Sequence, residues 1–217
     1  MQGLEAAKRR LIDEMRRTVK DGRVLDAMAQ VPRERFVPPE LASKAYDDAP
    51  QPIGEGQTIS QPLIVAMMTE ALALTGDERV LEVGTGSGYQ AAVLAHLARE
   101  VVSAERFPAL AQSARLRLAS LGLTNVSVHV SGEGAPIGWP DSAPYDAVVV
   151  TAAAPYVPQA LLDQVKDGSR IVIPVGPREQ QELLVVTRRG EGIRRRSLGG
   201  CRFVPLIGSQ AWPPEPF

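Results

Sequence analysis

Apolar residues near the N-terminus recur at intervals of three, four or seven positions, which is the spacing of one face of a helix. Basic and acidic residues separate them, and the members of the set are Leu4, Leu11, Ile12, Met15 and Val19. The pattern predicts a surface helix that ends at Gly22. A second, shorter helix is predicted over Val24–Val31, where Pro32 stops it.

The thirty residues from Pro32 to Pro62 differ from the rest of the chain. Six helix or strand breakers interrupt them, at Pro38, Pro39, Pro50, Pro52, Gly54 and Gly56. We expect no regular structure here, and we expect Asp47, Asp48 and Glu55 to be solvated loop acids. A long anchored loop in a compact domain is usually functional, so this segment is a candidate lid. Pro62 then opens a predicted helix over Leu63–Leu74.

Short β-rich runs alternate with helical runs after Arg79. The predicted strands are Val80–Val83, Val101–Ala104, Val126–Val130, Tyr145–Thr151 and Arg170–Val175, and the predicted helices are Tyr89–Ala98, Pro108–Leu121 and Pro158–Val165. Only turns separate the last runs, Leu183–Thr187, Ile193–Arg196 and Arg202–Leu206. This order predicts a doubly wound α/β sheet, mostly parallel, with antiparallel C-terminal strands and added N-terminal helices. Ligands bind such sheets at the carboxyl ends of the strands.

The run Val80–Tyr89 joins the first of these strands to a helix through Gly84, Gly86 and Gly88. Three glycines let a ligand approach the backbone closely. Glu82 ends the strand, where a carboxylate attracts an ammonium group and repels a pyrophosphate. An acid followed by Gly-x-Gly-x-Gly resembles the cofactor loop of S-adenosylmethionine-dependent methyltransferases, which have a Rossmann-like fold. A nicotinamide cofactor is disfavoured, because the third glycine also arrives one residue early for that class.

Two later positions extend this candidate cofactor site. Glu105 ends the second strand of the alternating series, where an acid can accept hydrogen bonds from both hydroxyls of a ribose. The loop Ser131–Gly138 follows the third strand, and Glu133 and Gly134 are our candidates for contacts to an adenine ring. A plain turn remains the alternative for that loop.

Composition narrows the class of protein. The 217 residues suit one structural domain, which we divide into 1–62 with the N-terminal helices and lid, a core over 63–210, and a tail over 211–217. The net charge of −1 gives no general electrostatic attraction to nucleic acid, and no membrane segment is visible. Cys201 is the only cysteine, so no internal disulfide forms. We expect a cytoplasmic monomer without a metal, a nucleic-acid partner or a membrane partner.

Motifs outside the glycine loop resemble one family closely. The matching stretches are Val31–Pro38, Ala45–Asp48, Gln57–Pro62, Asp146–Ala154, Ile173–Gly176 and Arg202–Leu206. Together they look like the protein-L-isoaspartate O-methyltransferase family, and the hexamer Gln-Thr-Ile-Ser-Gln-Pro is specific to it. The resemblance implies methyl transfer from S-adenosylmethionine to the α-carboxylate of L-isoaspartyl residues in damaged proteins, which leaves S-adenosylhomocysteine. The ester then recloses to a succinimide, which starts repair.

The resemblance also implies roles for single residues. Ser60 matches the active-site serine, with Thr58 and Ile59 beside it near substrate and cofactor. Glu105 matches the ribose-binding acid, and the glycines of the loop match those around the methionine and ribose. Val204, Pro205 and Leu206 match the segment that binds the substrate peptide. Glu133 departs from the family, which usually has Asp between these two glycines.

The chemistry of the acceptor fits the side chains available. A peptide α-carboxylate has a pKa near 3.3–3.7, so it is already an anionic nucleophile at neutral pH and needs no general base. His96 and His129 are therefore expected to be packing or surface residues. Ser60 would orient the carboxylate through its hydroxyl, while helix capping is its alternative role.

Two other function classes stay open from the sequence. A methyltransferase could act on another acceptor, such as a small carboxylic acid or an RNA base, since the glycine loop does not select the acceptor. A non-catalytic module could bind S-adenosylmethionine and report it to a partner, with Trp212 and Phe217 of the tail as contacts. The complete Gln57–Pro62 segment argues against both.

Overall fold

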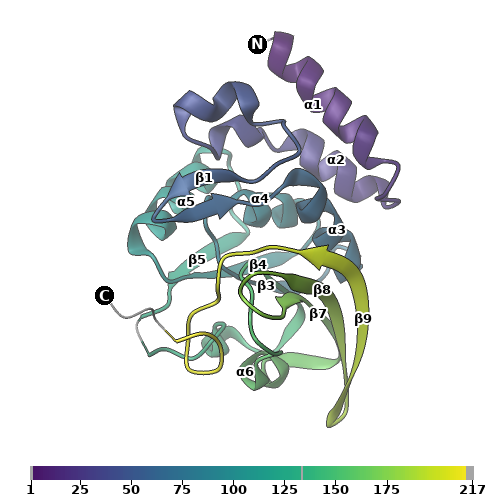
Figure 1. The fold of residues 1–217 in the computed structure, drawn as a ribbon, viewed down its shortest axis with the longest axis vertical. Coiled ribbons are helices and arrows are strands. Elements are labelled where there is room, and N and C mark those ends of the chain that lie inside the picture. Colours follow the sequence, from purple (N-terminus) through teal and green to yellow (C-terminus); the bar gives the residue numbers. More distant parts are fainter. Residues whose placement is uncertain (1, 133, 214–217) are drawn as a thin grey trace.

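A seven-stranded sheet forms the centre of the computed structural model, which describes residues 2–132 and 134–213. The strands lie in the order β5-β4-β3-β6-β7-β8-β9 (Figure 1). Their bounds are β3 Arg79–Val83, β4 Glu100–Glu105, β5 Val126–Val130, β6 Tyr145–Val150, β7 Val165–Val175, β8 Gln181–Arg189 and β9 Gly192–Cys201. The strands from β5 to β7 in this order pair in parallel. β8 is antiparallel to both of its neighbours, β7 and β9. The predicted fold class is confirmed.

Helices cover both faces of this sheet (Figure 1). The helices are α3 Pro62–Leu72, α4 Tyr89–Ala95 and α5 Pro108–Ser120 on one face, and α6 Gln159–Asp163 on the other, with a short 3-10 helix η3 at Pro140–Ser142. The side chains of successive strand residues point to opposite faces of the sheet. On β3, Val80 packs with the cluster under α3, α4 and α5, and Leu81 with the cluster that includes Leu161 of α6. A sheet covered on both faces needs near-continuous apolar strands, as the sequence has.

The N-terminal helices α1 Gln2–Met15 and α2 Gly22–Gln30 form a separate layer beyond α3. The prediction for Gly22 is wrong, because this residue begins α2. Asp21 is the N-cap of α2 and accepts a hydrogen bond from the Arg23 N–H. The Glu70 carboxylate of α3 accepts from the N–H groups of Lys20 and Asp21, so it ties the end of the linker to α3.

The segment before α3 contains more regular structure than expected. It holds the 3-10 helices η1 Arg33–Arg35 and η2 Pro39–Lys44 and an antiparallel hairpin of β1 Gln51–Gly54 and β2 Gln57–Ile59. Several of the prolines and glycines lie at the starts and turns of these short elements, where they do not disrupt hydrogen bonding. Gly54 and Gly56, with φ of 96° and 65°, make the hairpin turn, and Pro39 begins η2.

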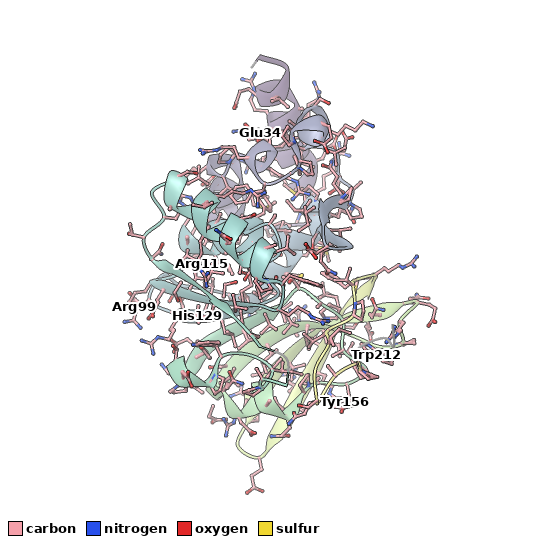
Figure 2. All side chains as sticks on the ribbon, turned by 90° about the vertical axis from the view of Figure 1, so that its left-hand side faces the viewer. Glu34, Arg99, Arg115, His129, Tyr156 and Trp212 are labelled. Atoms are coloured by element: carbon pink, nitrogen blue, oxygen red, sulfur yellow. The ribbon has the colours of Figure 1, made fainter. Side chains whose placement is uncertain are left out.

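The stretch Arg202–Leu206 is not the predicted strand. It runs instead beside the end of β6, where Ala153 donates to the Val204 carbonyl and accepts from the Leu206 N–H. The chain then folds back, since the Trp212 N–H donates to the Leu206 carbonyl. Trp212 and Tyr156 lie near the C-terminal strands, far from Glu34 of η1 (Figure 2). Tail residues 214–217 lie outside the described residues. None of the helices described is long and apolar enough to cross a bilayer.

Candidate functional site

The glycine loop lies at the carboxyl end of β3, between β4 and β6. Gly84, Gly86 and Gly88 all have positive φ, at 99°, 53° and 90°. A Cβ on Gly84 would overlap the Thr151 hydroxyl, and one on Gly88 would lie 3.1 Å from the Ala114 Cβ of α5. Gly84 therefore permits close contact with the end of β6, and Gly88 permits close packing of α5.

Residues of both neighbouring strands hold the loop backbone in place. From the β4 side, the Glu105 carboxylate accepts hydrogen bonds from the N–H groups of Gly86 at 2.8 Å and Phe107 at 3.0 Å. From the β6 side, the Thr151 hydroxyl donates to the Gly84 carbonyl at 2.5 Å. Each Glu105 oxygen accepts one bond and keeps a second lone pair for a ligand hydroxyl.

Glu82 is fully buried, with 0% of its surface exposed, on the sheet face that α4 covers. The Ser103 hydroxyl donates to Glu82 Oε2, and the Thr85 hydroxyl lies 2.5 Å from the same Ser103 oxygen. Glu82 Oε1 has no hydrogen-bond partner within the described residues. Burial raises the pKa of the Glu82 carboxyl to about 8, against the lowering effect of Ser103. A buried oxygen without a partner is a free acceptor for a donor group of a ligand, such as an ammonium.

The loop after β5 lies next to this site. The Ser131 N–H donates to the Glu105 carbonyl at 2.8 Å, which brings the loop to the end of β4. Gly134 is exposed, with φ of 77°. Glu133, our other candidate for adenine, lies outside the described residues.

Ser60 is half-buried between β2 and α3. Its carbonyl accepts a hydrogen bond from Arg33 Nη2 at 2.8 Å, and its hydroxyl has no partner among the residues described. Helix capping by Ser60 is not observed, because the N-cap of α3 is Gln61.

Asp48 caps α3 in place of a nearby serine. One oxygen of its carboxylate accepts from the Leu63 N–H at 2.9 Å, and the other accepts from the Gln61 side-chain amide at 2.8 Å. Leu63 is the second residue of α3, whose N–H has no partner within the helix. Asp48 is thus not merely the solvated loop acid that we expected. It fixes the chain immediately after Ser60.

The β1–β2 hairpin brings the two residues before Ser60 toward the glycine loop. Ile59 is buried and pairs with Gln51, whereas Thr58 is exposed and pairs with Pro52. A Cβ on Gly86 would lie 3.3 Å from the Ile53 Cδ1 of β1. The hairpin therefore packs directly against the glycine loop, and its action as a lid stays a prediction.

The candidate substrate segment Val204–Leu206 reaches the same edge of the sheet through Ala153, two residues after the Thr151 that binds Gly84. Val204 is half-buried, Pro205 is exposed and Leu206 is buried. The structure thus places the hairpin, the glycine loop and this segment around the carboxyl ends of β3 and β6.

Arg33, which binds the Ser60 carbonyl, was not among the residues singled out from the sequence. Arg33 is fully buried, and besides Ser60 it binds the Ala45 carbonyl through Nε at 2.8 Å. Its guanidinium lies 4.7 Å from the centre of the Tyr89 ring. An arginine between two prolines and other charged residues gave no signal of burial in the sequence.

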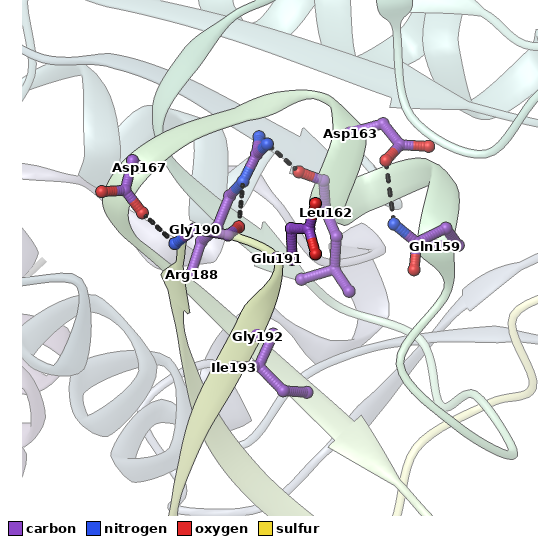
Figure 3. A pocket seen from close by; sticks show the side chains of 9 residues that line it. All are labelled: Gln159, Leu162, Asp163, Asp167, Arg188, Gly190, Glu191, Gly192 and Ile193. Carbon is purple, nitrogen blue, oxygen red and sulfur yellow. Dashed lines mark hydrogen bonds between the residues drawn. The ribbon is translucent and has the colours of Figure 1, made fainter.

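Other polar features involve residues outside the glycine loop. His129 stacks on Trp139 with 4.3 Å between ring centres. The described residues contain no group of three or more His, Cys, Asp or Glu side chains that could hold a metal. A surface hollow of about 390 Å³, seen in Figure 3, lies between α6 and the β8–β9 turn. It does not include any of the candidate cofactor residues.

Comparison with known proteins gives consistent results. The family model for Protein-L-isoaspartate(D-aspartate) O-methyltransferase matches residues 6–211. The chain is 55% identical over 199 residues to the protein-L-isoaspartate O-methyltransferase of Methanoculleus marisnigri, over 92% of this chain and 90% of the relative. It is 50% identical over 214 residues to protein-L-isoaspartate O-methyltransferase 1 of Syntrophobacter fumaroxidans, over 98% and 99%.

Solved structures agree in fold. One described as a protein-L-isoaspartate O-methyltransferase has a TM-score of 0.82 and 28% identity, covering 94% of this chain and 67% of that chain. A putative enzyme of the same kind from Plasmodium falciparum, in complex with S-adenosyl-L-homocysteine, has a TM-score of 0.75 and 24% identity, covering 89% and 95%.

The buried state of Glu82 predicts a pH-dependent stability. Its pKa rises from an ordinary value of 4.5 to about 8 on folding, so the folded protein retains a proton that the unfolded chain releases. This stabilisation is complete below the unfolded pKa and is lost as pH rises toward 8. Glu82→Gln cannot ionise, so its free energy of unfolding should fall less steeply than that of the wild type over this range.

Urea unfolding at a series of pH values measures this difference. Glu182→Gln is the matched control, because Glu182 is an exposed acid on β8 and its loss should leave the wild-type slope. Parallel pH profiles for wild type and Glu82→Gln would show that Glu82 is not protonated in the folded protein.

Proposed function

The chain belongs to the protein-L-isoaspartate(D-aspartate) O-methyltransferase family, and we propose how its residues divide the work of that reaction. The enzyme transfers a methyl group from S-adenosylmethionine to the α-carboxylate of L-isoaspartyl residues in damaged proteins and peptides. The ester recloses to a succinimide, which starts repair. Family membership sets aside the other acceptors and the non-catalytic module considered from the sequence.

The residues at the carboxyl end of β3 fit S-adenosylmethionine, which supplies an electrophilic methyl group on a sulfonium when bound. We assign Glu82 to its cationic methionine end, because Glu82 Oε1 is buried without a partner in the described part of the chain. The free lone pairs of the Glu105 carboxylate are assigned to the ribose hydroxyls. Gly84 and Gly86 allow close approach of the cofactor, and Gly88 keeps α4 and α5 in contact. Gly134 and Glu133 remain our candidates for adenine.

The acceptor side of the site consists of the hairpin, Ser60 and the C-terminal segment. We assign substrate contacts to Thr58, Ile59 and Ser60 at the end of the hairpin and to Val204, Pro205 and Leu206 beside the end of β6. This assignment rests on one observation, which is that Ser60 has a fixed backbone and a free hydroxyl among the described residues. Arg33 and Asp48 fix the backbone around it, while its hydroxyl has no partner among the described residues. Such a hydroxyl is held ready to donate to a carboxylate.

Catalysis by placement is sufficient for this reaction. The α-carboxylate is ionised at neutral pH, so its oxygen can attack the methyl carbon without losing a proton. The residues must hold that oxygen on the methyl axis and exclude water, and orientation of this kind contributes about 7–11 kcal/mol in favourable cases. Burial lowers the pKa of His129, which lies against Trp139 rather than near Ser60.

We further propose that the enzyme works in the cytoplasm as a monomer, on protein and peptide substrates, without nucleic-acid or membrane partners. The net charge of −1 and the single cysteine support this. The division into residues 1–62, 63–210 and 211–217 stays a prediction.

Cofactor affinity should depend on both oxygens of Glu105. Glu105→Gln keeps the shape of the side chain but replaces one acceptor by an amide donor, so it loses at least one charge-assisted bond of about 1.5–3 kcal/mol. The dissociation constant for S-adenosylhomocysteine should rise by about tenfold or more. Calorimetry measures it, with Glu182→Gln as a control that should bind normally. An unchanged constant would show that Glu105 serves only the loop backbone.

Loss of the Ser60 hydroxyl should slow the reaction without weakening cofactor binding. In Ser60→Ala, kcat on an isoaspartyl peptide should fall by an amount set by one charge-assisted hydrogen bond of about 1.5–3 kcal/mol, with residual activity. Between pH 6 and pH 8 the wild type should show no ionisation in kcat that the variant abolishes, since no base is needed.

Ser120→Ala is the control for loss of a serine hydroxyl at the end of α5, where this exposed hydroxyl accepts from Arg35 and donates to the Arg117 carbonyl. It should keep the wild-type kcat. Reduced thermal stability of Ser60→Ala with an unchanged kcat would assign Ser60 a purely structural role. A pH-dependent step that disappears on replacement of His96 or His129 would show that a base takes part.

A further inference from the structure

Arg33 is a fully buried cation without a carboxylate partner. Its side chain has 0% exposure, and none of the ion pairs among the described residues includes it. Removing an unpaired charge from water costs free energy. Hydrogen bonds and other favourable contacts within the protein must offset this cost. Here the compensation comes from two carbonyl oxygens and an aromatic ring.

These three contacts lie on separate segments of the chain. Nε donates to the Ala45 carbonyl just after η2, and Nη2 donates to the Ser60 carbonyl, both at 2.8 Å. The guanidinium carbon lies 4.7 Å from the centre of the Tyr89 ring. Tyr89 is the first residue of α4 and follows Gly88 directly, so its ring is attached to the glycine loop.

The environment of Tyr89 makes this arrangement rigid. The Tyr89 ring is buried and packs edge to face with Phe36, at 5.5 Å between ring centres. A guanidinium is planar, and its N–H groups leave in fixed directions. Two carbonyls bound by one guanidinium therefore have a fixed separation, and the ring fixes the plane of the fork relative to α4. Asp48 restrains the residues that follow Ser60.

We propose that Arg33 is a positioning residue, which sets the place of Ser60 relative to the glycine loop and thus the alignment of acceptor and methyl donor. This inference rests on the role proposed for Ser60. Because Arg33 binds the Ser60 carbonyl directly, its effect on the reaction passes through the Ser60 backbone. A misplacement of about 1 Å can cost up to a hundredfold in rate, so a residue remote from the reacting atoms can control kcat.

Arg33→Lys tests the proposal, because lysine keeps the charge and most of the volume but cannot hold two carbonyls in one planar fork. We expect kcat on an isoaspartyl peptide to fall about tenfold or more. The dissociation constant for S-adenosylhomocysteine should change by less than about threefold, because the bonds of Glu105 and Thr151 to the loop are untouched.

Arg188→Lys is the matched control. Arg188 also binds backbone carbonyls through its guanidinium, those of Leu162, Val165 and Gly190, but it lines the hollow shown in Figure 3. This variant should lose some thermal stability and keep the wild-type kcat. If Arg33→Lys folds poorly, Arg33→Gln, which keeps one donor group, should show the same loss of kcat in its folded fraction.

A double-mutant cycle with Ser60→Ala separates this inference from the proposed function. If Arg33 acts through Ser60, Arg33→Lys should slow the Ser60→Ala enzyme much less than it slows the wild type. Independent, additive losses would overturn the positioning role while leaving the role of Ser60 intact. A wild-type kcat in Arg33→Lys would also overturn it. A wild-type kcat in Ser60→Ala alone would instead refute the role proposed for Ser60, and the inference with it.

Discussion

The glycine loop keeps its shape because the strands on either side of β3 bind its backbone. Glu105 at the end of β4 accepts from the Gly86 N–H, and Thr151 after β6 donates to the Gly84 carbonyl. Both contacts depend on the parallel register that brings three carboxyl ends to one edge of the sheet. They also explain the sequence, because the φ of 99° at Gly84 and its contact with Thr151 exclude a side chain there. The acceptor side of the site is built against this loop.

The acceptor side is assembled from segments that are far apart in the sequence. The hairpin packs on Gly86 through Ile53, and Ala153 pairs with the segment that carries Val204 and Leu206. These are packing contacts and backbone hydrogen bonds, and none of them involves a titratable side chain. The arrangement suits a reaction between an ionised carboxylate and a sulfonium methyl group, in which geometry and exclusion of water lower the barrier.

Local patterns in the sequence predicted most of the sheet and the position of the glycine loop. The alternation of apolar runs identified β3 to β7, and the three glycines after Glu82 identified the cofactor loop. Several of the errors share one physical cause, which is contact between residues distant in sequence. Arg202–Leu206 looks like a strand but pairs only with the end of β6. Asp48 caps a helix fourteen residues ahead, and the burial of Arg33 depends on Ser60 and Tyr89. No short-range pattern encodes such contacts.

Methyl transfer to matched peptides tests the central claim most directly. The enzyme and labelled S-adenosylmethionine are incubated with two peptides that differ only in carrying L-isoaspartate or L-aspartate at one position. We predict a base-labile methyl ester on the L-isoaspartyl peptide alone, because only that peptide has a free α-carboxylate beside a backbone that is longer by one methylene. Equal labelling of both peptides, or a base-stable product, would contradict this account of the acceptor.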